Sequence, residues 1–326
     1  MMKRRRAAAV MMAAMMTAGA LAGCQSGQKA ADTGAGSGAQ SQAVQESTEA
    51  VQESAGAAQS QTVQESTGAE QSQAVQENGE AVQKESVELI VFAAASMTET
   101  LTEIAQMYKE IRPEVEIIYT FDSSGTLKTQ IQEGADCDIF ISAAQKQMNQ
   151  LDISADPSVN TEGLDFVLEG SRFNLVENKV VLAVPDNNPA GITSYEDLGT
   201  DKLNLICLGN DDVPVGAYSI EILTTLGILE QLENDSKITY GSNVKEVTTQ
   251  VKEASVDCGI IYATDAFSAG LTVVDEAEED QCGQVIYPAA VLNISKHQEE
   301  ARDFLDYLTT DDCGAVFESV GFSIAR

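Results

Sequence analysis

The feature that most constrains the fold is an alternation, from residue 86 onward, of short apolar runs with longer amphipathic segments. The apolar runs have the length of strands and are, in chain order, ELIVF, VEIIY, DIFIS, KVVLAV, LNLICL, CGIIY and VIYPAAVL. The spacing of the apolar residues predicts helices over 97–111, 125–133, 143–151, 216–227, 244–254 and 297–309. Apolar strands separated by helices are typical of a parallel sheet covered on both faces, so we expect an α/β fold.

Five turns that join a predicted strand to a predicted helix are rich in small and hydroxyl-bearing residues. They are AAASMTE (93–99), FDSSGTL (121–127), VPVGAY (213–218), GSNVKE (241–246) and YATDA (262–266). In α/β folds, ligands bind beyond the carboxyl ends of strands, close to helix N-termini whose free N–H groups favour anions. Since Ser and Thr hydroxyls add neutral donors, these turns predict a site that holds an anion without a countercharge.

Ordinary helix capping is the alternative explanation of these turns. In SMTE, Ser96 and Glu99 have the spacing of a capping box, in which each side chain accepts a hydrogen bond from the other residue's backbone N–H. The two explanations are compatible, because Ser96 can serve a ligand while its neighbours cap the helix.

Groups that could carry out catalysis are scarce. The single histidine, His297, starts a predicted surface helix, so a Ser-His-Asp hydrolase is poorly supported. The sequence has no GxGxxG motif and no phosphate loop ending in Gly-Lys-Ser or Gly-Lys-Thr. An enzyme that uses a pair of carboxylates stays open as an alternative, but no spacing singles out such a pair. We therefore expect a binding protein and not an enzyme.

The folded part of the chain is strongly acidic. Residues 85–326 carry 13 Lys and Arg against 43 Asp and Glu. This balance argues against nucleic acid and against anionic lipid headgroups as partners.

Five cysteines lie beyond residue 100, and none of them forms a CxxC spacing, which argues against a zinc site. Cys137, Cys207 and Cys258 lie in apolar runs, and we expect them to be buried thiols. The sequence leaves open whether Cys282 and Cys313 form a disulfide bond.

Residues 1–24 have the features of an export signal. Positive residues from Lys3 to Arg6 precede an apolar segment that is too short for a comfortable membrane span. The segment ends in LAGC, which resembles a bacterial lipobox, so Cys24 is expected to carry lipid; an uncleaved N-terminal anchor is the alternative. Residues 25–86 repeat variants of AVQES without aromatic residues or proline, which predicts a disordered tether with a reach of roughly 40–45 Å.

Four segments within residues 87–326 resemble the molybdate-binding protein of the molybdate ABC importer. They are VFAAASMTETLTEIA, FDSSGTLKTQIQEGADCDIFISAA, VPVGAYSIEILTTLGI and GIIYATDA. The AAAS and SSGTL turns, in this order and spacing, are fairly specific to that family. The resemblance implies a two-lobed periplasmic-binding-protein fold of type II, with a cleft that closes on a tetrahedral oxyanion.

The same resemblance implies five groups that bind the oxyanion. They are the hydroxyls of Ser96, Ser124 and Tyr262 and the backbone N–H groups of Val215 and Val244. All five are hydrogen-bond donors, which suits a full dianion such as molybdate. Asp122 stands where that family commonly has a neutral residue, and we expect it to point away from the anion, because an unpaired carboxylate facing a dianion is very unfavourable.

The resemblance also implies a function and a division of the chain. We expect a monomeric, lipid-anchored protein that captures molybdate, and tungstate with it, outside the cytoplasmic membrane and delivers it to the permease of an ABC importer. No cofactor and no cation site are expected, and sulfate or another oxyanion is the alternative ligand. Lobe 1 is expected to comprise residues 86–175 plus 289–326, and lobe 2 residues 176–288.

Overall fold

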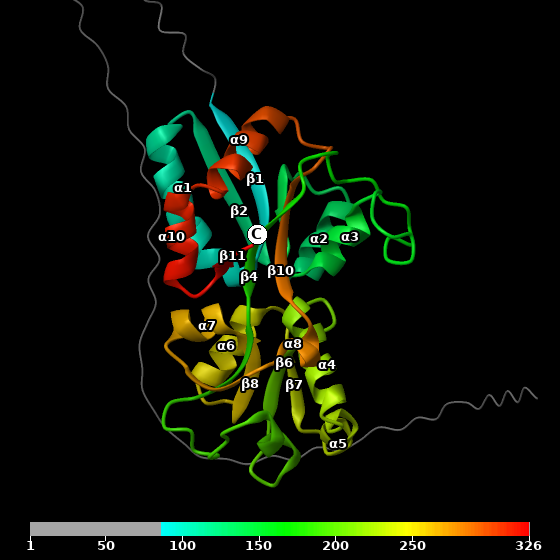
Figure 1. Cartoon of the computed structure of the whole chain (residues 1–326), viewed down its shortest axis with the longest axis vertical. Helices are drawn as coiled ribbons and strands as arrows, with labels where there is room; N and C mark the ends of the chain where they lie inside the picture. The colour runs from blue at the N-terminus through cyan, green and yellow to red at the C-terminus, as the bar shows by residue number, and fades with distance from the viewer. Residues whose placement is uncertain (1–85, 326) are drawn as a thin grey trace, which may run out of the picture. The chain divides into compact units, whose positions relative to one another are not determined.

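Two β-sheets with flanking helices organise residues 86–325, the part of the chain that the computed structural model describes (Figure 1). The predicted export signal, Cys24 and the tether lie outside these residues. Each sheet belongs to one lobe, and the α/β class predicted from the sequence is confirmed.

The first sheet has six strands in the order β11-β4-β10-β3-β1-β2. They are β1 (Val87–Ala94), β2 (Val115–Asp122), β3 (Ile139–Ile141), β4 (Phe173–Asn178), β10 (Val285–Val291) and β11 (Ser323–Ile324). β1 pairs in parallel with β2 and β3. β10 runs antiparallel to β3 and β4, and β11 antiparallel to β4, so the sheet is mixed and the prediction of a parallel sheet is wrong for these strands.

Helices cover both faces of the first sheet because β1 is apolar on both sides. Leu89 and Val91 belong to the core on the face covered by α1 (Thr98–Ile111), α9 (Gln298–Leu308) and α10 (Asp311–Ser319). Phe92 points the other way, into a second cluster beneath α2 (Ser124–Gln132) and α3 (Gln145–Leu151). Alternation along one strand thus fixes which helices lie on which side.

The second sheet has five strands in the order β7-β6-β8-β5-β9. They are β5 (Val180–Val184), β6 (Ile206–Gly209), β7 (Ile238–Gly241), β8 (Cys258–Tyr262) and β9 (Thr272–Glu276). β6 pairs in parallel with β7 and β8, while β5 is antiparallel to β8 and β9.

Helices cover the second sheet as well, and four of them matter for its packing: α4 (Pro214–Thr225), α6 (Val244–Lys252), α7 (Ala263–Ala269) and α8 (Glu279–Cys282). Figure 1 shows α6 and α7 on one side of this sheet and α4 with α8 on the other. The short helix α5 (Leu229–Asn234) follows α4.

The chain passes between the sheets at two places. β4 ends at Asn178 and β5 begins at Val180, while α8 precedes β10, which begins at Val285. The lobe limits expected from the sequence, 175/176 and 288/289, therefore fall inside β4 and β10, and we propose instead that the limits coincide with the ends of these two strands.

The cysteines within residues 86–325 are all free. Cys137, Cys207 and Cys258 are buried, as predicted, and Cys282 and Cys313 are not joined to each other. Among the described helices, none is both long and apolar enough to cross a membrane.

Candidate functional site

A small cavity of about 10 Å³ lies where turns of the two lobes meet. Its lining residues are Ala94, Ala95, Ser96, Asp122, Ser123, Ser124, Ala143, Val213, Pro214, Val244 and Tyr262. Four of the five predicted binding residues are in this set, and the fifth, Val215, directly follows Pro214. The structure thus brings together turns that are more than 160 residues apart in the sequence.

Ser96 lies in a short 3-10 helix, η1 (Ala95–Met97), that separates β1 from α1. Its hydroxyl oxygen lies 2.9 Å from the hydroxyl of Tyr287. The capping-box interpretation of Ser96 and Glu99 is wrong, because η1 delays the start of α1, whose N-cap is Met97 without a side-chain bond. Ser96 is therefore free of capping and is 4% exposed, at the wall of the cavity.

The two adjacent serines before α2 have different partners. Ser123 is the N-cap of α2, and its Oγ accepts a hydrogen bond of 3.1 Å from the N–H of Thr126. The Oγ of Ser124 accepts a 2.9 Å bond from the N–H of Ala143 in the neighbouring loop. Because that bond occupies a lone pair, the Ser124 hydroxyl keeps its own proton to donate into the cavity.

The second lobe presents the first turns of α4 and α6 to the cavity. Val215 is the second residue of α4 and Val244 the first residue of α6, where a helix supplies no partner for the backbone N–H. Pro214 has no N–H, so Val215 is the first donor of its turn. Asn243 caps α6 by accepting a 3.1 Å bond from the N–H of Glu246, which leaves the N–H of Val244 outside the cap.

Tyr262 ends β8 and is 1% exposed, yet its hydroxyl has no hydrogen-bond partner among the described residues. Burial raises the pKa of this phenol well above 10, so it stays a protonated donor at neutral pH. An unpaired buried donor costs roughly 1–3 kcal/mol. A ligand in the cavity would remove this cost, which makes Tyr262 the clearest sign of a binding site.

Turns of the two lobes are in direct contact beside the cavity. The N–H of Gly125 in α2 donates a 2.9 Å hydrogen bond to the carbonyl oxygen of Asp212, which precedes α4. Asp122, at the end of β2, also lines the cavity; its Oδ1 accepts bonds from the N–H of Ser123 at 2.7 Å and from Nδ2 of Asn243 at 3.3 Å. At least this oxygen is therefore turned toward protein donors.

A lysine links the lobes next to these contacts. Nζ of Lys245 in α6 lies 2.8 and 2.7 Å from the carboxylate oxygens of Glu99 in α1 and 3.1 Å from Oδ1 of Asp265 in α7. Burial raises the pKa of Asp265 to about 6, and the charge of Lys245 opposes that rise only in part. Burial by itself lowers the pKa of Lys245. The carboxylates of Asp265 and Glu99 have the larger effect, so the pKa of Lys245 is raised.

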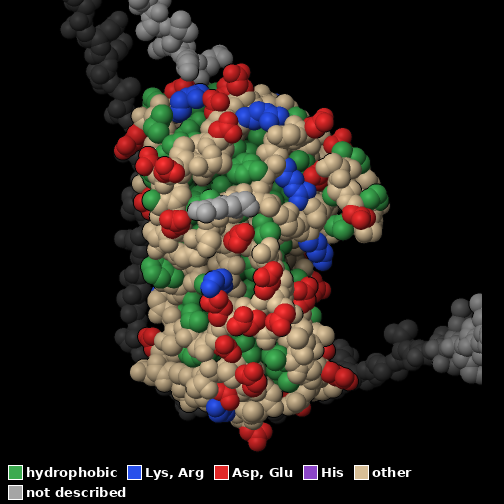
Figure 2. Space-filling view, viewed as in Figure 1, with side chains coloured by type: hydrophobic (Ala, Val, Ile, Leu, Met, Phe, Trp, Pro, Cys, Tyr) green, Lys and Arg blue, Asp and Glu red, His purple; other side chains and the backbone are tan. Residues whose placement is uncertain are grey.

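The lining of the cavity contains a single charged residue, Asp122, and no Lys, Arg or His among the residues described. Lys245 lies nearby but is engaged by two carboxylates. Figure 2 shows acidic side chains spread over one face of the molecule, with Lys and Arg more sparsely placed. We expect an anion in the cavity to depend on neutral donors. Among the described residues, no cluster of His, Cys, Asp and Glu could hold a metal ion.

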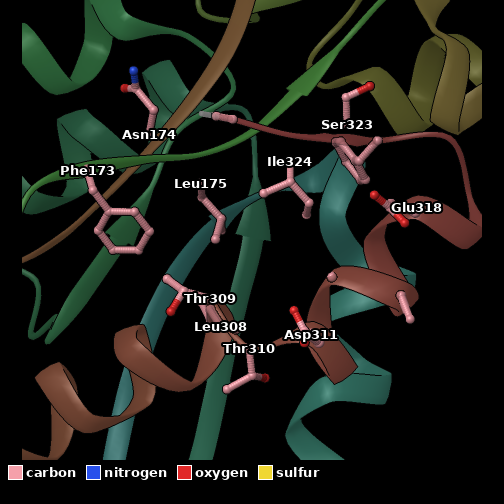
Figure 3. A pocket seen from close by; sticks show the side chains of 14 residues that line it. Phe173, Asn174, Leu175, Leu308, Thr309, Thr310, Asp311, Glu318, Ser323 and Ile324 are labelled. Atoms are coloured by element: carbon pink, nitrogen blue, oxygen red, sulfur yellow. The ribbon is translucent and has the colours of Figure 1, made fainter.

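A much larger hollow, of about 890 Å³, lies elsewhere, between β4, β11 and the junction of α9 and α10 (Figure 3). The side chains of Phe173, Leu175 and Ile324 face it. The hydroxyls of Thr309 and Thr310 in its wall donate to backbone carbonyls of the preceding turn at 2.7 and 2.8 Å. These bonds are local, so the protons of these two hydroxyls are used within the helix ends.

Known proteins share the sequence pattern and the fold of this chain. A family model described as bacterial extracellular solute-binding protein matches residues 89–323. YvgL of Bacillus subtilis, provisionally named an ABC transporter substrate-binding lipoprotein, is 35% identical over 239 residues, which are 73% of this chain and 86% of that protein. The molybdate-binding protein ModA of Haemophilus influenzae is 32% identical over 243 residues, covering 73% of this chain and 91% of ModA.

Among solved structures, the periplasmic molybdate-binding protein of Azotobacter vinelandii superposes with a TM-score of 0.63 at 21% identity, over 73% of this chain and all of that chain. This likeness confirms the two-lobed, type II periplasmic-binding-protein fold, and the ModA match confirms the resemblance to molybdate-binding proteins. The chain therefore belongs to the bacterial extracellular solute-binding protein family.

Proposed function

We propose that this solute-binding protein captures molybdate, and tungstate with it, outside the cytoplasmic membrane and delivers it to the permease of an ABC importer. The observation that carries the proposal is the cavity between the lobes, where the unpartnered hydroxyl of Tyr262 lies among hydroxyls and helix N-termini. The match to ModA of Haemophilus influenzae supports molybdate as the ligand.

The donors of the site suit a dianion that carries no proton. They are the hydroxyls of Ser96, Ser124 and Tyr262 and the backbone N–H groups of Val215 and Val244, none of which is an obligate acceptor. Helix N-termini stabilise negative charge through unpaired N–H groups and the helix dipole. The cavity, of about 10 Å³, is far smaller than the pockets of several hundred Å³ that hold larger organic ligands, which supports a small ion as the ligand.

The place of action follows from the N-terminal region and from one relative. Cys24 in LAGC would carry lipid and hold a monomeric domain at the membrane surface, close to the permease. The provisional name of YvgL, a substrate-binding lipoprotein, supports this arrangement.

Isothermal titration calorimetry of the purified protein against molybdate, tungstate, sulfate and phosphate tests the proposal. We expect saturable binding of molybdate and tungstate with one ion per chain and no chemical turnover. Tighter binding of sulfate than of molybdate would assign the protein to sulfate instead. Conversion of a bound ligand into a product would show an enzyme on the same fold.

A further inference from the structure

A chain of buried polar side chains leads from the cavity to the strands that connect the lobes. The Ser96 hydroxyl lies 2.9 Å from the hydroxyl of Tyr287 in β10. Nδ2 of Asn178, the last residue of β4, donates to the Tyr287 hydroxyl oxygen at 3.2 Å and to Oγ1 of Thr264 in α7 at 2.9 Å. Tyr287 is 0% exposed and Asn178 is 8% exposed, so these groups have little access to water.

Asn178 defines the direction of its own hydrogen bonds. Oδ1 of Asn178 accepts a 2.9 Å bond from the N–H of Lys179, which fixes the amide so that Nδ2 faces Tyr287. An amide nitrogen only donates, so the Tyr287 oxygen accepts from Asn178 and its own proton is available for Ser96. Burial raises the pKa of Tyr287 well above 10, so this proton is present throughout the neutral range.

The hydroxyl at the end of this series of hydrogen bonds, that of Ser96, lies at the cavity. If Tyr287 donates to Ser96 Oγ, the Ser96 proton has no other described partner and faces the site that Ser96 lines. Hydrogen bonds arranged head to tail polarise one another, which strengthens the final donor toward an anion.

We infer that Asn178 and Tyr287 are positioning residues that turn the Ser96 hydroxyl proton toward the bound oxyanion. This inference rests on the proposed function of the cavity. Both residues lie in the strands that connect the lobes, and Asn178 also holds Thr264 of the second lobe. The donor strength of Ser96 is therefore tied to the relative placement of β4, β10 and α7.

A double-mutant cycle on Ser96 and Tyr287 tests the inference. Tyr287→Phe removes one hydroxyl and keeps the ring, and we expect it to weaken oxyanion binding about five- to tenfold. In a Ser96→Ala background the same change should alter the dissociation constant less than about twofold, because Tyr287 acts only through Ser96. A residue with a merely structural role would give the same loss in both backgrounds.

Tyr195→Phe is the matched control. Tyr195 is 2% exposed, its hydroxyl also has no partner among the described residues, and it does not line the cavity. This variant should bind with the affinity of the unmodified protein. Asn178→Ala is the second test variant, and it should lose more affinity when Ser96 is present than in the Ser96→Ala background; a loss common to both backgrounds would come from its bond to Thr264. Thermal melting of each ligand-free variant confirms that it is folded.

The cycle is measured with whichever of molybdate, tungstate and sulfate binds the unmodified protein most tightly. Failure to bind molybdate contradicts the proposed function alone, since the cycle can still be completed with another of these anions. Equal losses in both backgrounds overturn the inference. So does unchanged or tighter binding by Tyr287→Phe, which would show that the Ser96 proton points to Tyr287 and not to the ligand.

Discussion

At the scale of single residues, the place of a hydroxyl within its turn decides what the hydroxyl does. Ser123 and Ser124 are adjacent and chemically identical, yet the first caps α2 and the second accepts from Ala143 at the cavity wall. The backbone rotates by about 100° per residue as it enters a helix, so neighbouring side chains leave in different directions. The position at which α2 begins therefore explains why Ser123 caps the helix and Ser124 faces the cavity.

Ser124→Ala should weaken molybdate binding roughly ten- to a hundredfold, because it removes one charge-assisted hydrogen bond worth roughly 1.5–3 kcal/mol. Calorimetric titration measures the change. Ser123→Ala is the matched control: it should lower the free energy of unfolding by about 1 kcal/mol through loss of the cap, with a smaller effect on affinity. A dissociation constant that stays the same in Ser124→Ala would remove Ser124 from the site.

We expect the orientation of Asp122 to decide the selectivity among oxyanions. Phosphate keeps at least one proton near neutral pH and needs an acceptor, without which a buried donor is left unpaired at a cost of roughly 1–3 kcal/mol. Since Oδ1 of Asp122 is occupied by Ser123 and Asn243, we expect molybdate and tungstate to bind first, sulfate well below and phosphate last. Asp122→Asn should keep this order and raise dianion affinity, because it removes a nearby negative charge.

Competition titrations of the unmodified protein and of Asp122→Asn measure that order. Phosphate binding above sulfate, with the advantage lost in Asp122→Asn, would show that the carboxylate accepts the phosphate proton. That result would contradict molybdate as the ligand.

The sequence located the residues around the cavity better than the hydrogen-bond partners of their side chains. Small, hydroxyl-rich turns after apolar strands drew attention to these segments, and the resemblance to molybdate-binding proteins implied Ser96, Ser124, Val244 and Tyr262, which line one cavity. Nothing in the sequence pointed to Tyr287, because its bond to Ser96 joins residues 191 positions apart and no periodicity encodes such a contact. The capping box failed for a local reason, since a 3-10 turn moved the helix start beyond Ser96.

At the scale of helices and strands, periodicity located most elements but not their directions. The helices predicted over 97–111, 125–133 and 244–254 correspond to α1, α2 and α6 with ends within two residues. The antiparallel pairing of β10 was missed, because the residue pattern of an apolar strand is the same beside a parallel and beside an antiparallel neighbour. Direction depends on how the chain returns from the second lobe, which is a property of the whole topology.

One contact between elements depends on a glycine. A Cβ atom at Gly125 in α2 would lie 2.4 Å from the carbonyl oxygen of Asp212, far inside van der Waals contact with backbone that cannot move aside as a side chain can. Gly125→Ala should therefore keep α2 away from the turn before α4 and weaken molybdate binding by about tenfold or more, the equivalent of one or two lost hydrogen bonds. Titration calorimetry measures the loss.

Gly314→Ala is the control for the effect of alanine in a helix. A Cβ atom at Gly314 in α10 would meet only the side chain of Ile324, at an ordinary 3.7 Å. Alanine favours a helix over glycine by roughly 0.5–1 kcal/mol, so neither variant should lose ligand-free thermal stability through helix propensity. Full molybdate affinity in Gly125→Ala would show that the ligand is held without this contact.

At the scale of the whole described domain, a buried ion pair makes stability depend on pH. Asp265 in α7 faces Lys245 of α6, with Glu99 of α1 beyond the lysine and Tyr262 and Tyr287 nearby. Burial raises its pKa to about 6 from 3.8, so the folded protein binds this proton more tightly than the unfolded chain does. The stability that Asp265 contributes is fully present below about pH 4 and is lost as the pH rises through 6.

Asp265→Asn removes this titration, so the melting temperature of the variant should rise relative to that of the unmodified protein between pH 4 and pH 7. The change corresponds to at most about 3 kcal/mol, for two pKa units of about 1.4 kcal/mol each. Asp197→Asn tests the opposite sign at lower pH, because Lys202 and Thr193 lower the pKa of Asp197 to about 2. The melting temperature of this variant should rise relative to that of the unmodified protein as the pH falls from about 4 to about 2, and the difference should stay constant between about pH 4 and pH 7. A difference in melting temperature that stays constant with pH would show that Asp265 does not titrate in this range.

The last property of the whole molecule is its position at the membrane, which we expect to depend on Cys24. A binding protein without an outer membrane to confine it would diffuse away from its permease, whereas a lipid on Cys24 and a tether with a reach of roughly 40–45 Å would keep it near. Cys24→Ser should therefore move the protein from the membrane fraction into a soluble or unprocessed form, while molybdate affinity stays unchanged because the cavity lies in residues 94–262. Fractionation with immunoblotting and titration of the recovered protein measure the two effects. If the variant stays with the membrane after high-salt washing, an uncleaved N-terminal helix anchors the chain and the lipobox interpretation of LAGC is wrong.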